Sequence, residues 1–332
     1  MTVLDVERLS KSFPIRSGLL QRETGRVRAV QDVSFTIARG ETLALVGESG
    51  CGKTTVARCI LRALPPSSGA IRFSPTPGTT VDLAPLSRKS LRPLRRHIQM
   101  IFQDPYASLN PRMMVGDIIA EPLVVAGVPA ALRLARVREL LDLVGLPPAA
   151  RTRFPHAFSG GQRQRIGIAR ALALHPTLVV ADEPVSALDV SVQAQIINLL
   201  LDLQDRLGLS LLFVAHDLGV VRHVSDRVAV MYVGRIVEVA PTTALYGRPR
   251  HPYTEALLAA VPKADPTLRD AVEAPRGEVA DPANPPPGCA FHPRCPHAID
   301  RCRVDVPALR EVEPGNFSAC HRAEELVLAG VD

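Results

Sequence analysis

Short apolar runs alternate with segments of helical spacing along most of this chain. The runs at 42–46, 178–181 and 209–215 are too short for helices and indicate buried strands. Between the last two, apolar residues recur at helical spacing over 191–207, and Gly208 marks the end of that helix. The pattern therefore predicts strands and helices in alternation.

The first part of the chain has a different character. Two strands are predicted at 3–13 and 29–37, and the polar stretch 14–28 between them predicts a surface loop. Further strands are expected at 69–73, 79–83 and 97–102, and a hairpin at 227–239.

Residues 110–158 change to helical spacing. Apolar positions predict helices at 115–125 and 131–144, with Gly145 and Pro147 as stops. We therefore expect an inserted, mostly helical subdomain at about 104–158.

Composition is that of an ordinary soluble globular protein. The 332 residues are 46% hydrophobic and 22% charged, enough for a substantial core and about two domains. No apolar run approaches the roughly 18 residues that cross a bilayer, and the first residues lack a signal segment. These features predict a cytoplasmic protein. The net charge of +6 is scattered as arginine, which indicates compositional bias more than a nucleic-acid or membrane surface.

A glycine-rich stretch follows the strand at 42–46 and precedes a helix at 56–64. This order predicts a phosphate-binding loop, in which backbone N–H groups and the helix dipole attract an anion. Lys53 would reach the β- and γ-phosphates, and the Thr54 hydroxyl would ligate Mg²⁺. The alternative is a glycine turn that contains Lys-Thr by chance. The candidate residues are Gly47, Glu48, Ser49, Gly50, Cys51, Gly52, Lys53, Thr54 and Thr55.

Polar residues stand where three predicted strands end. Asp182 and Glu183 follow a fully apolar strand, where paired carboxylates are costly without a positive partner. Asp182 can hold Mg²⁺ through its water, and Glu183 can orient or deprotonate an attacking water. Gln103 and His216 occupy the equivalent ends of two other strands. Alone, Gln103 would indicate a solvated strand end and His216 a structural histidine, but together the groups predict a γ-phosphate site.

A second glycine-containing helix start lies at Ser159, Gly160, Gly161 and Gln162. Ser159 is a good N-cap, and a plain capping role is one interpretation. Two glycines behind a cap weaken a helix, which favours a second anion site. Phe13 could stack an adenine ring or belong to the core.

Four cysteines cluster near the end of the chain, at Cys289, Cys295, Cys302 and Cys320. In a cytosolic protein such a cluster favours metal over disulfides. Its spacing matches neither the paired pattern of zinc sites nor the common ferredoxin patterns, so four unligated thiols stay equally open. Separately, Lys53 and a helix N-terminus could lower the pKa of Cys51 and make it a redox switch; a tolerated small residue is the simpler interpretation.

The ordered set of motifs, with 186–189 after the carboxylates, strongly resembles the nucleotide-binding subunit of ABC transporters. The resemblance implies an α/β fold: a RecA-like parallel sheet, an antiparallel β subdomain carrying Phe13, and the helical subdomain. It implies that Glu183, His216 and Gln103 act in ATP hydrolysis, that Thr54, Gln103 and Asp182 hold Mg²⁺, and that Asp189 lies at the nucleotide site. Ser159–Gln162 would contact ATP held by a partner subunit. Phe158 departs from the leucine usual in the family.

Within that family the chain looks like the oligopeptide, dipeptide and nickel importer ATPases, because of the 14–28 insertion, 102–112, 251–254 and the cysteine spacing. This implies a nucleotide-binding domain at 1–250 and a C-terminal region at 251–332. It implies a related second ATPase subunit, two membrane permeases, an extracytoplasmic solute-binding protein, no nucleic acid, and a place on the cytoplasmic face of the membrane. Some members carry a [4Fe-4S] cluster, which favours one here over zinc, with His292, His297 and His321 as substitute ligands. Peptide is the default substrate, with nickel, glutathione and sugars as alternatives.

Two rival classes share part of the motif set. Mechanical ATPases acting on nucleic acid need a long coiled-coil insertion, and no sustained heptad run is present. The translation-factor branch carries two motif sets in one chain, and here there is one.

Overall fold

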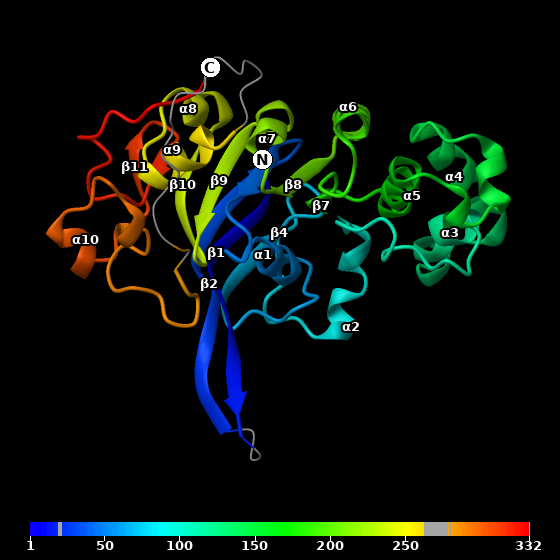
Figure 1. The fold of residues 1–332 in the computed structure, drawn as a ribbon. Helices are drawn as coiled ribbons and strands as arrows, with labels where there is room; N and C mark the ends of the chain where they lie inside the picture. Colours follow the sequence, from blue (N-terminus) through cyan, green and yellow to red (C-terminus); the bar gives the residue numbers. More distant parts are fainter. Residues whose placement is uncertain (19–21, 262–277, 279, 332) are drawn as a thin grey trace. The chain divides into compact units, whose positions relative to one another are not determined.

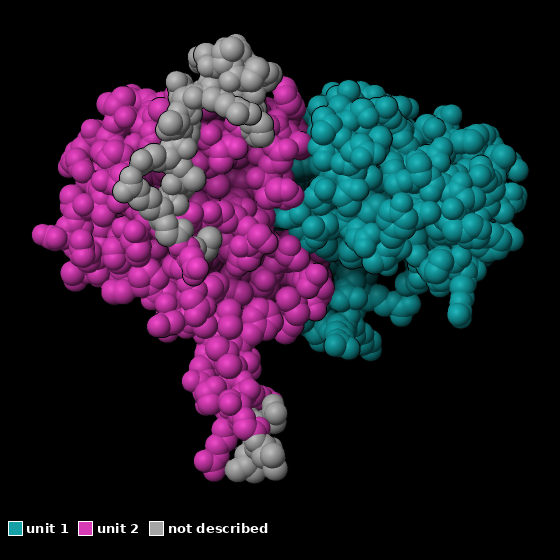
Figure 2. All heavy atoms as spheres, viewed as in Figure 1, with its two compact units in different colours: residues 1–4, 36–42, 72–214 teal, residues 5–35, 43–71, 215–332 magenta. Residues whose placement is uncertain are grey.

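The computed structural model describes residues 1–18, 22–261, 278 and 280–331, which form two compact units. Unit 1 contains residues 1–4, 36–42 and 72–214; unit 2 contains residues 5–35, 43–71 and 215–332 (Figure 2). Segments far apart in the sequence therefore build each unit, and the glycine-rich loop at 47–52 belongs to the same unit as the C-terminal region.

Unit 1 is built on three parallel strands, β6 (Ile98–Ile101), β7 (Leu178–Asp182) and β8 (Ser210–Ala215), in the order β8-β7-β6. Every residue of β7 and β8 is buried, as expected for apolar strands in the middle of an α/β layer. Parallel pairing places the carboxyl ends of β6 and β7 at one edge, because Ile101 pairs with Ala181. The strand β5 (Val81–Asp82) pairs with the end of β4 (Ser68–Phe73).

Helices make up most of the rest of unit 1. The predicted helices at 115–125 and 131–144 are confirmed as α3 (Val115–Val125) and α4 (Ala130–Leu143). The helix after β7 is α6 (Val190–Leu207), which ends at Gly208 with φ of 63°, a left-handed conformation that glycine adopts at low cost. The remaining helical segments are α2 (Arg88–Leu91), η1 (Leu94–Arg96), η2 (Pro148–Thr152), η3 (Pro155–Ala157) and α5 (Gly160–Leu172).

Unit 2 contains a second group of strands centred on β3 (Thr42–Val46) and β9 (Arg227–Tyr232). These two pair in parallel, and β9 turns back into the antiparallel β10 (Arg235–Pro241), which confirms the predicted hairpin. The short strands β12 (Asn316–Ser318) and β11 (Arg310–Glu313) extend this group beyond β10. The last part of the chain is thus joined to β10 by backbone hydrogen bonds.

The predicted surface loop at 14–28 is wrong for the described residues. The strands β1 (Thr2–Ser17) and β2 (Arg22–Ala38) continue through it and form a two-stranded ribbon that projects from the sheet β2-β1-β4 (Figure 1). Most side chains from Phe13 to Arg28 are exposed. Because both faces of such a ribbon meet water, its polar composition imitates that of a loop.

Short helices complete unit 2. They are α1 (Lys53–Ile60), α7 (Leu218–Val224), α8 (Thr242–Gly247), α9 (Pro252–Ala259), η5 (His292–Arg294) and α10 (Asp300–Val304). Among the described residues, none of the helices has both the length and the apolar character to span a bilayer.

Candidate functional site

The glycine-rich loop has the predicted order of strand, loop and helix, with β3 ending at Val46 and α1 beginning at Lys53. Gly47 and Gly52 have φ of 152° and 110°, and a Cβ atom on them would lie 2.1 Å from the carbonyl oxygens of Met231 and Ala29 respectively. Both contacts are with backbone, so no rotamer change could relieve them. Packing of the loop therefore requires glycine at both positions.

The N-terminus of α1 is open to a ligand. Gly52 is its N-cap and supplies no side-chain hydrogen bond, so no side chain caps the first turn. Such a terminus, with the positive end of the helix dipole, suits an anion.

Lys53 is buried at 5% exposure, and its Nζ donates hydrogen bonds to the carbonyl oxygens of Gly47 (2.7 Å) and Glu48 (3.1 Å). The ammonium group therefore lies inside the curve of the loop. Burial raises the pKa of the Cys51 thiol, although Lys53 opposes the change. A thiol with a raised pKa is less reactive, which argues against the redox switch considered for Cys51.

Two groups that sequence reasoning missed hold the loop from the C-terminal region. The Glu48 N–H donates to Tyr253 Oη at 2.9 Å, and the Glu48 carboxylate accepts two hydrogen bonds from Arg294. In the sequence, residues 251–254 and the cysteine spacing indicate only a family resemblance. Tyr253 and Arg294 are brought close to the loop by the fold, and a lone arginine between two cysteines gives no signal of that contact.

In unit 1, the structure brings Gln103 and Glu183 together. Gln103 Nε2 donates to Glu183 Oε2 at 2.9 Å, across 80 positions of sequence. Asp182 is 3% exposed at the end of β7. Glu183 has φ of 47°, a left-handed conformation that is strained for a non-glycine residue, and its N–H donates to the carbonyl of Val214. Strain of this kind is common at functional sites, where the surrounding structure enforces it.

At the second glycine-containing helix start, the side chains cap the backbone of the same helix. Ser159 Oγ accepts a hydrogen bond from the Gln162 N–H at 3.4 Å, and Gln162 Oε1 accepts one from the Ser159 N–H at 3.1 Å, a complete capping box. A Cβ on Gly161 would lie 2.5 Å from Val192 Cγ1. Packing against α6 thus explains one glycine without a ligand, while Ser159 and Gln162 remain exposed.

The other predicted nucleotide contacts lie on the surface. Phe13 is 36% exposed, and Lys11 Nζ lies 5.1 Å from the centre of its ring. His216, directly after β8, and Asp189, the N-cap of α6, are exposed. All three side chains are accessible to a ligand in solution.

The four C-terminal cysteines gather around one small cavity. Cys289, Cys295, Cys302 and Cys320 all line a space of about 20 Å³, with His292, His297 and His321 beside them. All four are free thiols, and burial raises the pKa of Cys295 to about 12 and of Cys320 to about 11. In the described part of the chain no three His, Cys, Asp or Glu residues are placed to hold a metal, so the structure contains no preformed ligand set for the predicted [4Fe-4S] cluster.

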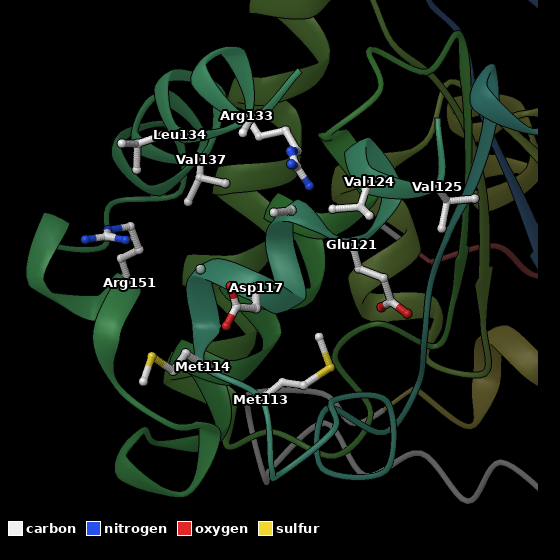
Figure 3. A pocket seen from close by; sticks show the side chains of 13 residues that line it. Met113, Met114, Asp117, Glu121, Val124, Val125, Arg133, Leu134, Val137 and Arg151 are labelled. Carbon is white, nitrogen blue, oxygen red and sulfur yellow. The ribbon is translucent and has the colours of Figure 1, made fainter. Parts of the chain in front are cut away.

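A cavity of about 470 Å³ lies on the helical part of unit 1 (Figure 3). Its walls come from α3, α4 and the neighbouring segments, and they carry exposed apolar side chains: Met114, Val124, Val125 and Leu134. Charged groups of both signs, including Asp117, Glu121, Arg133 and Arg151, stand among them (Figure 3).

Two family models match separate parts of the chain. Residues 30–186 match the family model "ABC transporter", and residues 237–302 match "Oligopeptide/dipeptide transporter, C-terminal region". The "Probable peptide ABC transporter ATP-binding protein y4tS" of Sinorhizobium fredii is 54% identical over 96% of this chain and 89% of its own. The oligopeptide transport ATP-binding protein AppF of Bacillus subtilis is 51% identical over 96% and 97%.

A solved structure supports the same assignment. The ATP-binding cassette MJ0796, a dimer in a post-hydrolysis state with ADP and Pi, aligns with a TM-score of 0.63 and 26% identity over 72% of this chain and 98% of its own. The predicted α/β fold of an ABC ATPase is therefore confirmed. The chain belongs to the ABC transporter family of ATP-binding proteins, in its oligopeptide/dipeptide branch.

Proposed function

We propose that this protein is the ATP-hydrolysing subunit of a peptide importer. The observation that carries the proposal is the 54% identity to a peptide transporter ATP-binding protein over 96% of the chain. The open, glycine-bounded N-terminus of α1 and the Gln103–Glu183 pair are consistent with it. The rival class, a mechanical ATPase acting on nucleic acid, is disfavoured by the match of 237–302 to the oligopeptide/dipeptide transporter region.

On this proposal, the phosphates of ATP bind at the N-terminus of α1, and Lys53 leaves the loop carbonyls to reach the β- and γ-phosphates. Thr54, Gln103 and Asp182 carry the oxygen donors that Mg²⁺ prefers. When bound, the ion neutralises phosphate charge. Phe13 stacks on the adenine, and His216 and Asp189 contact the nucleotide.

Glu183 is the general base of the hydrolysis. Its carboxylate takes a proton from the attacking water, and Gln103, hydrogen bonded to it at 2.9 Å, fixes its orientation. The left-handed backbone at Glu183 supports this role, since strained conformations of this kind cluster at functional sites.

Hydrolysis requires two subunits, since Ser159, Gly160, Gly161 and Gln162 serve the ATP of the partner. The exposure of Ser159 and Gln162 supports this arrangement. The partner is a related ATPase subunit or a second copy of this chain.

The cavity on the helical part of unit 1 is our candidate surface for a membrane permease. Its exposed apolar walls suit an amphipathic helix from such a partner (Figure 3). Two permeases and an extracytoplasmic solute-binding protein complete the proposed importer, and the ATPase then lies on the cytoplasmic face of the membrane. Val125→Asp should reduce co-purification with the permeases and leave unchanged the ATP hydrolysis by the ATPase dimer measured without them.

We propose a [4Fe-4S] cluster at the four cysteines as a separate point, with zinc as the second choice. Convergence of four thiols on one cavity supports it, because soft thiolates suit both. The side chains would have to rotate toward one another, since they are not placed as ligands in this structure. Protein purified without oxygen should absorb broadly in the visible region. Colourless protein with stoichiometric zinc would refute the iron assignment, and colourless protein with neither metal would refute both.

The central test is Glu183→Gln. General-base catalysis contributes on the order of 100- to 10,000-fold, so we expect turnover to fall within that range while ATP binding persists. Trapping of an ATP-bound dimer, measured by size-exclusion chromatography, should accompany the loss. The exposed Asp205→Asn on α6 is the matched control. Near-normal turnover of Glu183→Gln would contradict the proposed role, and stoichiometric nucleic acid in the purified complex would contradict the importer.

A further inference from the structure

The phosphate-binding loop carries an acidic side chain, which is unfavourable for a loop that binds an anion. Glu48 follows Gly47 directly, and its backbone carbonyl accepts a hydrogen bond from Lys53. An unpaired carboxylate here would repel the phosphates of ATP, since like charges in partly buried sites disfavour one another. The structure contains a group that offsets this charge.

That group is Arg294. Its Nη1 and Nη2 donate to Glu48 Oε2 and Oε1 at 2.8 Å and 3.0 Å, a bidentate pair joining residues 246 positions apart. The Arg294 side chain is 8% exposed and that of Glu48 is 28% exposed. Bidentate, largely desolvated pairs are stronger and more fixed in direction than surface ion pairs.

The position of Arg294 is set by packing in the C-terminal region. Its guanidinium group lies 6.0 Å from the ring centre of Tyr232 and 5.8 Å from that of Phe291. Those two rings meet edge to face at 5.4 Å, and Tyr253, which accepts the Glu48 N–H, packs against both. The side chain and the backbone of Glu48 are therefore held by one aromatic cluster.

The same cluster adjoins the cysteines. Arg294 lies in η5 between Cys289 and Cys295; its N–H donates to the Phe291 carbonyl, and the Cys295 N–H donates to that of His292. Movement of the cysteine segment would therefore displace Arg294.

We infer that Arg294 is a positioning residue for ATP binding, supplied by the cysteine-containing region, that acts by neutralising and fixing Glu48 of the phosphate-binding loop. The inference rests on the proposed ATPase function and adds to it a role for the C-terminal region. It makes ATP affinity depend on the packing of the cysteine segment.

A double-mutant cycle on the full-length protein separates charge pairing from general packing. Arg294→Ala should raise the KM for ATP about tenfold and leave kcat within about twofold, because binding of the anion is lost equally in the ground state and the transition state. Glu48→Gln alone should change KM by less than about twofold. The combined variant should return to the KM of Glu48→Gln, since the repelling carboxylate is gone.

Two further variants make the result decisive. Arg294→Lys keeps the positive charge but cannot form the bidentate pair with Glu48, so it should give an intermediate KM. This variant tests the inference if Arg294→Ala fails to fold. Arg301→Ala, an exposed arginine of the same region paired with Asp305, is the control and should match the wild type. A KM unchanged in both Arg294 variants, or a double variant as weak as Arg294→Ala, would overturn the inference. Wild-type protein that binds no ATP would instead overturn the proposed function.

Discussion

Glycine is the N-cap of α1 and the first residue of α5, yet the two N-termini are built in opposite ways. In α1 no side chain caps the first turn, and Lys53 lies against the loop carbonyls. In α5 Ser159 and Gln162 cap each other's backbone groups. The N-terminus of α1 leaves its N–H groups available to a ligand that binds to the same subunit. On the proposed function, the N-terminus of α5 exchanges part of its own cap for a phosphate of the partner's ATP.

The glycines at the two helix starts also have different structural roles. Gly52 would meet a backbone oxygen if it carried a Cβ, whereas Gly161 would meet a valine side chain. The first constraint cannot be relieved by substitution elsewhere, but the second can. Gly52 is required by the path of the backbone before α1, whereas Gly161 is required by the packing of α5 against α6.

Removing the cation from the open terminus should have the largest effect. Lys53→Ala deletes the buried ammonium group and should weaken ATP binding on the order of 100-fold, since several charge-assisted hydrogen bonds to phosphate are lost. Equilibrium dialysis with labelled ATP measures this, and Lys89→Ala on the exposed α2 is the control. Equal affinities of the two variants would show that α1 is not the phosphate site.

The contacts that anchor Tyr253 beside the glycine-rich loop before α1 should depend on pH, whereas the capping box of α5 should not. Fully buried Glu238 accepts hydrogen bonds from the N–H groups of Arg250 and His251 and from Thr254 Oγ1, which anchors the start of α9 and hence Tyr253. Burial raises the pKa of Glu238 from 4.5 to about 7. Since the folded value is the higher one, its contribution to stability is complete below about pH 4.5 and is lost as pH rises through 7.

The loss should approach about 3 kcal/mol, from the size of the pKa change. The contribution of His251 to stability changes with pH in the opposite direction. Burial lowers the pKa of His251 from 6.5 to about 3, so its contribution is complete above pH 6.5 and is lost as the pH falls toward 3. The difference in unfolding free energy between wild type and Glu238→Gln, measured by urea titration from about pH 4.5 to 8, isolates the glutamate. Parallel pH profiles would contradict the assignment.

Overpacking should disturb the second terminus less. Gly161→Ala places a Cβ 2.5 Å from Val192 Cγ1 and should cost about 1–2 kcal/mol, after the usual gain of alanine over glycine in a helix. Val192→Ala in the same chain should restore most of the loss. Gly160→Ala, whose Cβ would lie 3.3 Å from Leu188, is the milder companion. If Val192→Ala brings no recovery in thermal unfolding, packing is not the reason for this glycine.

Removing the cap itself should have the smallest effect on stability. Ser159→Ala should cost about 1 kcal/mol in unfolding free energy and leave ATP binding by the isolated subunit unchanged. The rate of ATP hydrolysis by the dimer should fall by more than the loss of folded protein explains, because the Ser159 hydroxyl is also the proposed contact with the partner's ATP. Ser159→Thr should retain both properties. A weaker binding of ATP to isolated Ser159→Ala would place this loop at the subunit's own nucleotide.

The sequence predicted the fold well where apolar spacing was strong. The helix at 115–125 and the hairpin at 227–239 are present, because burial of an apolar face fixes the period of the pattern. It failed at 14–28, where a ribbon exposed on both sides leaves no apolar alternation to detect. The Gln103–Glu183 contact agrees with the placement of both residues at the ends of strands.

By itself the sequence determined the glycine-rich loop, our candidate phosphate site, and the adjacent carboxylates at the end of β7, since both motifs consist of residues adjacent along the chain. Only the tertiary structure decided that Glu48 is paired with Arg294 and that Gly161 faces Val192. Those contacts join residues distant in sequence through the packing of whole elements. No local pattern records a partner 246 positions away, because its place depends on every element that folds between them.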